Sequence, residues 1–265
     1  MRRRTFAALA VALALPIGAA GAERMTDEQV KKLIEDIDAG YKTWRQDLEK
    51  SNLDDAVITS AERTIKVKDF LKDFDQAIDV LKGRFKPDYA ASPEVLALLR
   101  RGSDVELRNR RQSQTPRSAW TALGSKLDAL AHAYGLAWPV ESMSVQAARL
   151  NDGELAGKVE RMENAAKQLQ SETEKAAKAN KSIDKATRAS LKSSIQQLEQ
   201  TAKEVRSRIK DDRPASVEVG QLLSQTTRVK ETLAELSLPS AGGPAWPGIE
   251  SGNEALARAF DLPKP

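Results

Sequence analysis

Residues 64–86, TIKVKDFLKDFDQAIDVLKGRFK, decide the fold of this chain. Their apolar residues follow one another at alternating intervals of four and three, which places them on one stripe of an α-helix, as in a heptad repeat. The stripe consists of Val67, Leu71, Phe74, Ile78, Leu81 and Phe85. Such a stripe cannot shelter itself from water, so this stretch predicts a helix that packs against partner helices.

The same spacing recurs 124 residues later in the chain. The second copy consists of Leu191, Ile195, Leu198, Ala202, Val205 and Ile209. Further matches extend the repeat, because residues 26–50 match residues 151–175 and residues 84–99 match residues 208–223. Matches near the ends of the two copies keep nearly the same offset, so the loops barely change in length. The sequence therefore predicts two tandem copies of one unit.

Each unit is predicted to contain four helices, because runs with helical periodicity alternate with short polar breaks. We expect them at residues 27–50, 55–85, 92–112 and 118–134, and at about 152–179, 183–209, 217–237 and 247–260. Thr26 with Gln29 forms a capping box, and Gly135 ends the fourth helix. No alternating apolar run reaches strand length. The predicted fold class is all-α: two tandem repeats of an antiparallel, up-down four-helix bundle-like unit with long heptad-patterned helices.

The domain boundaries follow from this repeat. We expect residues 23–139 to form the first bundle repeat and residues 140–265 the second. A unit of this length is large enough for a core of its own. Two arrangements stay open: two separate bundles, or one continuous core in which the long first and second helices of both units merge.

Residues 1–22 have the parts of a cleavable export signal. Residues 2–4 are arginines, residues 6–15 form a short apolar run, and residues 20–22, Ala-Gly-Ala, offer a cleavage site. The mature protein is therefore expected in the periplasm. The arginines fit the twin-arginine pattern only in part, so we favour the general secretory route over the twin-arginine route.

Composition excludes several classes of protein. The chain contains no cysteine, so disulfides and a lipid anchor built on cysteine are not expected. No apolar run is long enough for a transmembrane span. The chain has 42 basic and 38 acidic residues, and removal of the three arginines at residues 2–4 leaves 39 and 38, a net charge of +1. This balance gives no reason to expect nucleic acid as a partner.

Patterns typical of catalytic and metal sites do not occur. The lone histidine, His132, lies off the apolar stripe of its helix, so we expect it to face solvent and not to bind haem or a metal. The chain has neither thiolate zinc ligands, nor a nucleophile turn, nor a glycine-rich phosphate loop. Carboxylates fall between the apolar positions, which argues against an acid–base pair in a cleft. We therefore expect no enzyme activity, no metal and no cofactor.

One face of the helix expected at residues 92–112 is rich in arginine. At about 100° per residue, four side chains fall within one arc opposite the apolar stripe: Arg100, Arg101, Arg108 and Arg111. This arc indicates a surface for an anionic partner, such as a phosphate, a lipid headgroup, an acidic glycan or an acidic protein. The alternative is a solvated face, because Asp104 lies in the same arc and can pair with its neighbours.

Polar residues interrupt the apolar stripes in three places. Asn109, Gln112 and Asn253 occupy positions that Leu fills in the other copy. They indicate either a solvent-accessible helix end or the opening of a ligand cavity. Trp120 and Trp138 would form a binding lip beside Asn109 and Gln112, or else cap the bundle core.

These patterns favour an exported, non-enzymatic helical-bundle protein of the cell envelope that acts as a binding or scaffolding module. Its partner would be another protein or an anionic component of the envelope. The alternative is a periplasmic carrier that holds a small ligand in a pocket of one or both bundles. The sequence predicts no oligomeric state.

Overall fold

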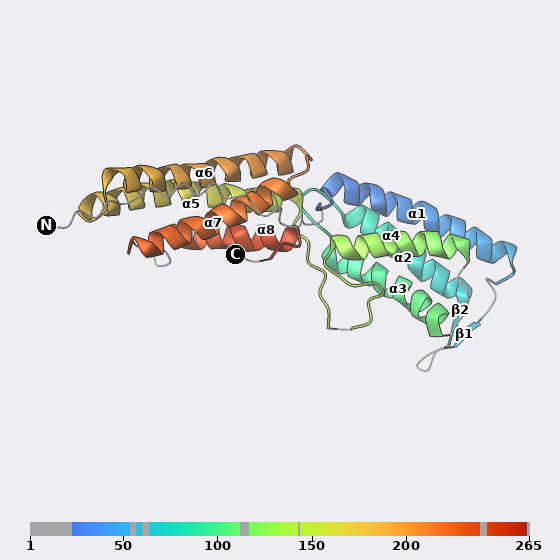
Figure 1. The fold of residues 1–265 in the computed structure, drawn as a ribbon. Coiled ribbons are helices and arrows are strands. Elements are labelled where there is room, and N and C mark those ends of the chain that lie inside the picture. Colours follow the sequence, from blue (N-terminus) through green and yellow to red (C-terminus); the bar gives the residue numbers. More distant parts are fainter. Residues whose placement is uncertain are drawn as a thin grey trace.

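The computed structural model describes residues 23–53, 57–59, 64–111, 117–142, 144–238 and 243–263. Within these ranges the chain is all-helical apart from one short hairpin, as the sequence predicts, and the helices pack as bundles (Figure 1). The first half contains α1 (Asp27–Lys50), α2 (Val67–Arg84), α3 (Ser92–Arg111) and α4 (Ser118–Ala133). The second half contains α5 (Asp152–Ala179), α6 (Lys185–Lys210), α7 (Ser216–Glu235) and α8 (Trp246–Ala259).

Capping boxes fix the N-termini of the two long helices that begin each half. Thr26 Oγ1 accepts the backbone N–H of Gln29, whose side chain accepts the backbone N–H of Thr26, so the predicted box is confirmed. Asn151 and Glu154 form the same box at α5. Each box satisfies donors that the helix leaves unpaired, and so defines the residue at which the helix begins.

The structure differs from the expectation of a helix over residues 55–85. α2 begins only at Val67, and the residues before it form an antiparallel hairpin of β1 (Val57–Thr59) and β2 (Thr64–Lys66). The two strands consist largely of Val, Ile and Thr, whose branched Cβ atoms favour extended backbone. From Val67 onward the predicted stripe does face inward, since its residues as far as Leu81 are buried.

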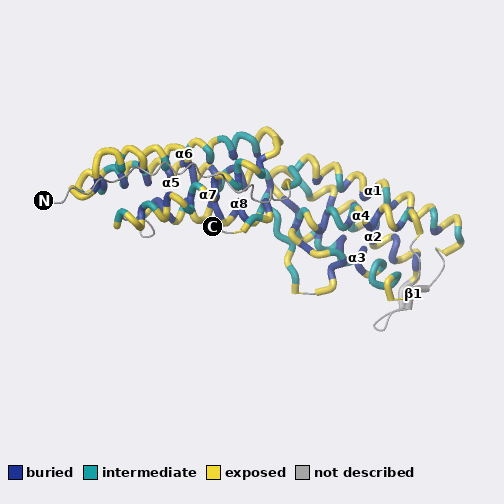
Figure 2. The backbone as a smooth tube through the Cα atoms, in the orientation of Figure 1, coloured by how far each residue is buried: buried dark blue, intermediate teal, exposed yellow. Residues whose placement is uncertain are grey.

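Two hydrophobic clusters form, one in each half, and Figure 2 shows the buried residues along the inner faces of both. In the first cluster the rings of Tyr41 and Phe74 stack with their centroids 5.3 Å apart, and the ring centroids of Trp44 and Trp120 lie 4.8 Å apart. The second cluster consists mainly of aliphatic residues, with Trp246 as its largest side chain. The clusters share no residue, so the chain folds into two separate bundles. Their origin in a duplicated unit remains a prediction from the sequence.

The two bundles lie end to end, and the segment between α4 and α5 joins them (Figure 1). The chain leaves α4 at Gly135, which adopts a φ of +67°, a conformation that glycine tolerates without strain. The backbone N–H of Val140 donates to Ser103 Oγ at 2.8 Å, and that of Ala148 donates to the carbonyl oxygen of Tyr134 at 3.2 Å. These bonds fasten the connecting segment to the first bundle.

Candidate functional site

Four charged residues meet where the N-termini of α1 and α5 approach each other. Arg24 pairs with Asp152, and Arg149 pairs with Asp27 at 2.7 Å. The backbone N–H of Asp27 donates to Asp152 Oδ2 at 2.6 Å, and that of Asp152 donates to Asp27 Oδ2 at 2.8 Å. We call Arg24, Asp27, Arg149 and Asp152 the clasp, because they link the two bundles.

The clasp has a two-fold pattern. Arg24 also donates to the carbonyl oxygen of Leu150 at 2.6 Å, and Arg149 donates to that of Met25 at 2.8 Å. Each contact made by one half is thus repeated by the residue 125 positions away in the other half. Contacts of this kind are typical of isologous interfaces, in which both partners use the same surface.

The charged side chains of the clasp are largely shielded from water, so their charges depend on one another. The side chain of Arg149 is 3% exposed and that of Asp27 15%. Desolvation by burial lowers the pKa of Arg149 and raises the pKa of Asp27, although their mutual attraction opposes both shifts. Each charge therefore depends on its partner, and a clasp that lost one member would leave the other buried and uncompensated.

A cavity of about 1150 Å³ opens beside the clasp, between the ends of the two bundles. Arg24 and Arg149 line it, together with the connecting segment and the C-terminal ends of α4 and α8. The two helix ends contribute residues at matching positions: Ala129, His132 and Ala133 from α4, and Ala255, Arg258 and Ala259 from α8. The lining therefore repeats at an offset of 126 residues, as the clasp repeats at 125.

The other charged residues that line the cavity differ in their engagement. Glu23 accepts the backbone N–H groups of Ala215 and Ser216 at the start of α7. Glu254 takes part in an interaction within the chain. Lys158 and Arg258 form no hydrogen bond or ion pair with any other described residue, and the same is true of the exposed Asp261.

His132 faces solvent, as the sequence predicts. Its side chain is 71% exposed and lies against Asp128, one turn earlier on α4. In the part of the chain that the structure describes, no group of three or more His, Asp or Glu side chains is arranged to hold a metal ion.

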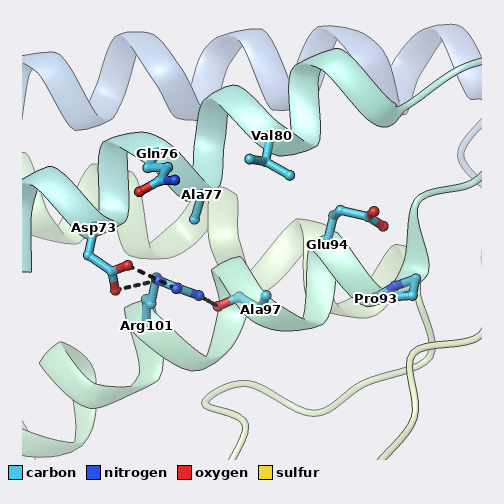
Figure 3. A pocket seen from close by; sticks show the side chains of 8 residues that line it. All are labelled: Asp73, Gln76, Ala77, Val80, Pro93, Glu94, Ala97 and Arg101. Carbon is cyan, nitrogen blue, oxygen red and sulfur yellow. Dashed lines mark hydrogen bonds and ion pairs between the residues drawn. The ribbon is translucent and has the colours of Figure 1, made fainter.

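The predicted arginine face of α3 is divided by ion pairing. Arg101 forms a bidentate pair with Asp73 of α2, at 2.7 and 3.0 Å (Figure 3). Arg100 is half-buried and also interacts within the chain. Arg108 and Arg111, further along the same helix, form no pair with a described residue, and Arg111 is exposed. Two of the four arginines thus have no ion-pair partner among the described residues.

A smaller hollow of about 310 Å³ lies between α2 and α3. The pair of Arg101 with Asp73 borders one end of it, and Pro93 and Glu94 border the other (Figure 3). Val80, which is 45% exposed, supplies part of its apolar wall. This hollow is an open depression on the surface, and we assign no site to it.

The two tryptophans of the predicted lip have different surroundings, since Trp120 lies in the bundle core and Trp138 is only half-buried. Trp120 is 2% exposed, packs against Trp44 and donates its indole N–H to Glu106 at 3.0 Å. Trp138 is half-buried and lies against Gly102 in the middle of α3. Trp120 therefore caps the bundle core, which is the second of the two uses considered, and it does not reach an accessible opening.

The polar breaks in the stripes also have different surroundings. Asn253 is 5% exposed, and its Oδ1 accepts the hydroxyl of Thr226 at 3.3 Å inside the second bundle. It marks neither a frayed helix end nor the mouth of a cavity, because a buried polar partner satisfies it. Asn109 is partly exposed near the end of α3, and Gln112 lies outside the described residues.

The sequence analysis does not predict the clasp or the cavity beside it. A signal was present, since Arg24 and Arg149 both stand two residues before the N-cap of a long helix, and Asp27 and Asp152 both follow that cap. The motifs are RMTD at residues 24–27 and RLND at residues 149–152. An arginine and an aspartate that flank the N-cap in both copies are candidates for contacts between the copies.

Comparisons with protein-family models, with curated proteins and with solved structures give no match to this chain. None of the helices in the described ranges combines the length and the apolar composition that a membrane span requires.

Proposed function

We propose that this chain is an exported, non-enzymatic helical-bundle protein of the cell envelope that acts as a binding or scaffolding module. The observation that carries the proposal is the clasp, a buried and reciprocal set of ion pairs that joins two closed bundles end to end. The pattern of residues 1–22 supports export to the periplasm.

The packing of the bundles supports a role carried out at the surface. Tyr41, Phe74 and Leu127 are fully buried in the first bundle, and Leu198 and Ile249 in the second. Protein cores are close-packed, so side chains that fill the interior in this way leave little room for a ligand inside either bundle. A scaffold also has to hold its surfaces in a fixed relation, and ion pairs with defined geometry favour one orientation of the two bundles.

The proposed partner is another protein or an anionic component of the envelope. Arg108 and Arg111 are the members of the arginine arc that no described residue engages. Guanidinium groups bind carboxylates and phosphates through two hydrogen bonds at once, so an acidic partner suits this end of α3.

A second candidate function is that of a carrier for a small ligand, which the junction cavity favours. Its volume of about 1150 Å³ is slightly above the range typical of ligand sites, which is roughly 300–1,000 Å³. The cavity lies between the bundles, so a ligand would sit at the junction and not inside one bundle as the sequence analysis expects.

Site-specific photo-crosslinking in the native host tests the first function. A photo-reactive residue would replace Arg108 on α3, Gln146 beside the cavity or Lys181 at the far end of the second bundle; the structure places Gln146 and Lys181 at exposed positions. A binding module should crosslink to one defined partner from some of these positions and not from others. Equal labelling from all three positions, or recovery of the chain only from the cytoplasm, would contradict the proposal.

A further inference from the structure

We propose that the junction cavity binds a free amphipathic anion, which is a carboxylate or phosphate head group on an apolar chain. This inference rests on the second candidate function, that of a carrier. The cavity combines an apolar lining with cationic side chains that have no described partner, and this combination selects the class of ligand.

The apolar part of the lining comes from both bundles and from the segments between them. Its apolar side chains include Met25, Leu136, Leu150, Phe260 and Leu262. Alanines at two successive turns of α4 and two of α8 leave room between these helices, because their side chains end at Cβ. An alkyl chain placed there would remove apolar surface of both the ligand and the cavity from water, which favours binding.

The head group would lie near the two lining cations that have no partner among the described residues. Lys158 of α5 is half-buried and Arg258 of α8 is exposed, and both line the cavity. Arg24 and Arg149 are already paired with the clasp aspartates. Of the acids, Glu23 caps α7 and Glu254 interacts within the chain. Asp261 is the lining carboxylate that has no partner among the described residues, so the lining groups without such a partner carry net positive charge.

Other classes of ligand fit the cavity less well. A wholly apolar ligand would cover Lys158 and leave its ammonium group with neither water nor a counter-charge. Inorganic phosphate would pair with the cations but leave the apolar lining exposed to water. A cationic ligand would meet Lys158 and Arg258 with like charge. An amphipathic anion satisfies both parts of the lining.

Isothermal titration calorimetry on the mature chain tests the inference with four probes: decanoate, decyl phosphate, decanol and inorganic phosphate. Decanoate and decyl phosphate are used below their micellar concentrations, and decanol below its solubility limit. We expect decanoate and decyl phosphate to bind at one site, decanol to bind more weakly and inorganic phosphate not to bind. Lys158→Gln and Arg258→Gln should each weaken decanoate binding about tenfold, the loss of one charge-assisted hydrogen bond. Arg161→Gln, an exposed arginine one turn from Lys158 that does not line the cavity, should leave the affinity unchanged.

A second variant separates the cavity from the surface charge. Ala129→Phe should abolish binding of decanoate by filling the space beside α4, and circular dichroism should show that the helices remain. Equal affinity for decanol and decanoate, unchanged by Lys158→Gln, would overturn the anion inference and leave the carrier function in place. Absence of binding by all four probes would overturn the inference, whereas the carrier function fails only if protein from its native compartment also carries no small molecule by mass spectrometry. Binding to anionic vesicles that Ala129→Phe does not reduce would place the anion on the outer surface and contradict the proposed site.

Discussion

Asp27 and Asp152 each accept a hydrogen bond from the backbone N–H of the other, at 2.6 and 2.8 Å. Each is the first residue of a long helix, so each carboxylate lies at the positive end of its own helix dipole and of its counterpart's. The same carboxylates receive Arg149 and Arg24. The relative position of the two bundles therefore depends on contacts that each need one residue from either bundle.

The first prediction concerns the contribution of the clasp to stability. Arg149→Leu should lower the free energy of unfolding by about 3 kcal/mol, because it removes the nearer counter-charge of the buried Asp27 carboxylate and leaves only Arg24, at 4.0 Å. Urea denaturation followed by circular dichroism measures the loss. Arg45→Leu is the matched control, since its ion pair with Glu49 is about half exposed and should contribute only about 0.3–0.5 kcal/mol. Equal losses in the two variants would show that burial of the clasp has no energetic consequence.

The second prediction concerns acid sensitivity of the first bundle. Burial alone would raise the pKa of Asp38, but hydrogen bonds from Lys82 at 2.5 Å and from Lys42 at 3.1 Å outweigh it and lower the pKa below its ordinary value. A carboxyl whose pKa is lower in the folded state stabilises the fold above its unfolded pKa, and this contribution is lost as the pH falls toward the folded pKa. Asp38→Asn should therefore be less stable than the wild type at neutral pH, by about 1–3 kcal/mol, and this difference should shrink below about pH 4.

Urea denaturation at a series of pH values between about pH 2 and pH 7 checks this behaviour. Lys82→Met is a second variant, which leaves Asp38 in place but removes its strongest hydrogen bond. Like Asp38→Asn, it should lose less stability than the wild type as the pH falls. A difference between wild type and Asp38→Asn that stays constant with pH would contradict the role given to this carboxylate.

Much of the fold follows from the sequence because two kinds of local signal agree. The heptad stripe of α6, from Leu191 to Ile209, is fully buried as its spacing predicts. The capping residues Thr26 and Asn151 define helix starts to the residue. The start of α2 was predicted wrongly, because the hairpin before it depends on strand pairing that a helical periodicity does not reveal.

The candidate site could be predicted only in part, because it depends on contacts between residues far apart in the chain. Arg101 meets Asp73 across two helices, which no spacing along α3 indicates. Trp120 has a buried partner in Trp44, so its indole serves the core and not a lip. The clasp joins residues that lie 125 positions apart, so it can be recognised only by comparing residues 24–27 with residues 149–152.

The third prediction uses two helical glycines with different surroundings. A Cβ atom added at Gly252 of α8 would lie 2.8 Å from the Cβ atom of Met162, whereas one added at Gly157 of α5 would meet nothing within 4 Å. Gly252→Ala should therefore destabilise the second bundle by about 1–3 kcal/mol through overpacking. Gly157→Ala should instead stabilise the chain by about 0.5–1 kcal/mol, because alanine loses less backbone entropy in a helix. Thermal denaturation of both variants gives the two signs, and stabilisation by Gly252→Ala would show that α5 and α8 are not in close contact there.

The last prediction concerns a pair of core positions that the two bundles fill in different ways. In the first bundle a Cβ atom at Gly102 would stand 2.7 Å from Leu127 Cδ1, so a large apolar residue faces a glycine. In the second bundle the matching positions hold Thr226 and Asn253, which form a hydrogen bond at 3.3 Å. The first bundle thus fills the space beside a glycine with Leu127 and Trp138, and the second fills it with two polar side chains of intermediate size.

A double-mutant cycle tests whether these two solutions are interchangeable. Asn253→Leu alone should lower the free energy of unfolding by about 1–3 kcal/mol, because the larger side chain crowds Thr226 and removes the hydrogen bond between the two residues. The Thr226 hydroxyl keeps its bond to the carbonyl oxygen of Leu222 at 3.0 Å. Thr226→Gly alone should cost about 1 kcal/mol or more, from the loss of helix propensity and of packing. Combined, the two changes recreate the pair found in the first bundle, so the double variant should be more stable than the sum of the single losses predicts, with a coupling of about 0.5–3 kcal/mol. Additive losses would mean that the positions are not equivalent in the two bundles, and that the matching offset between the copies does not extend to their packing.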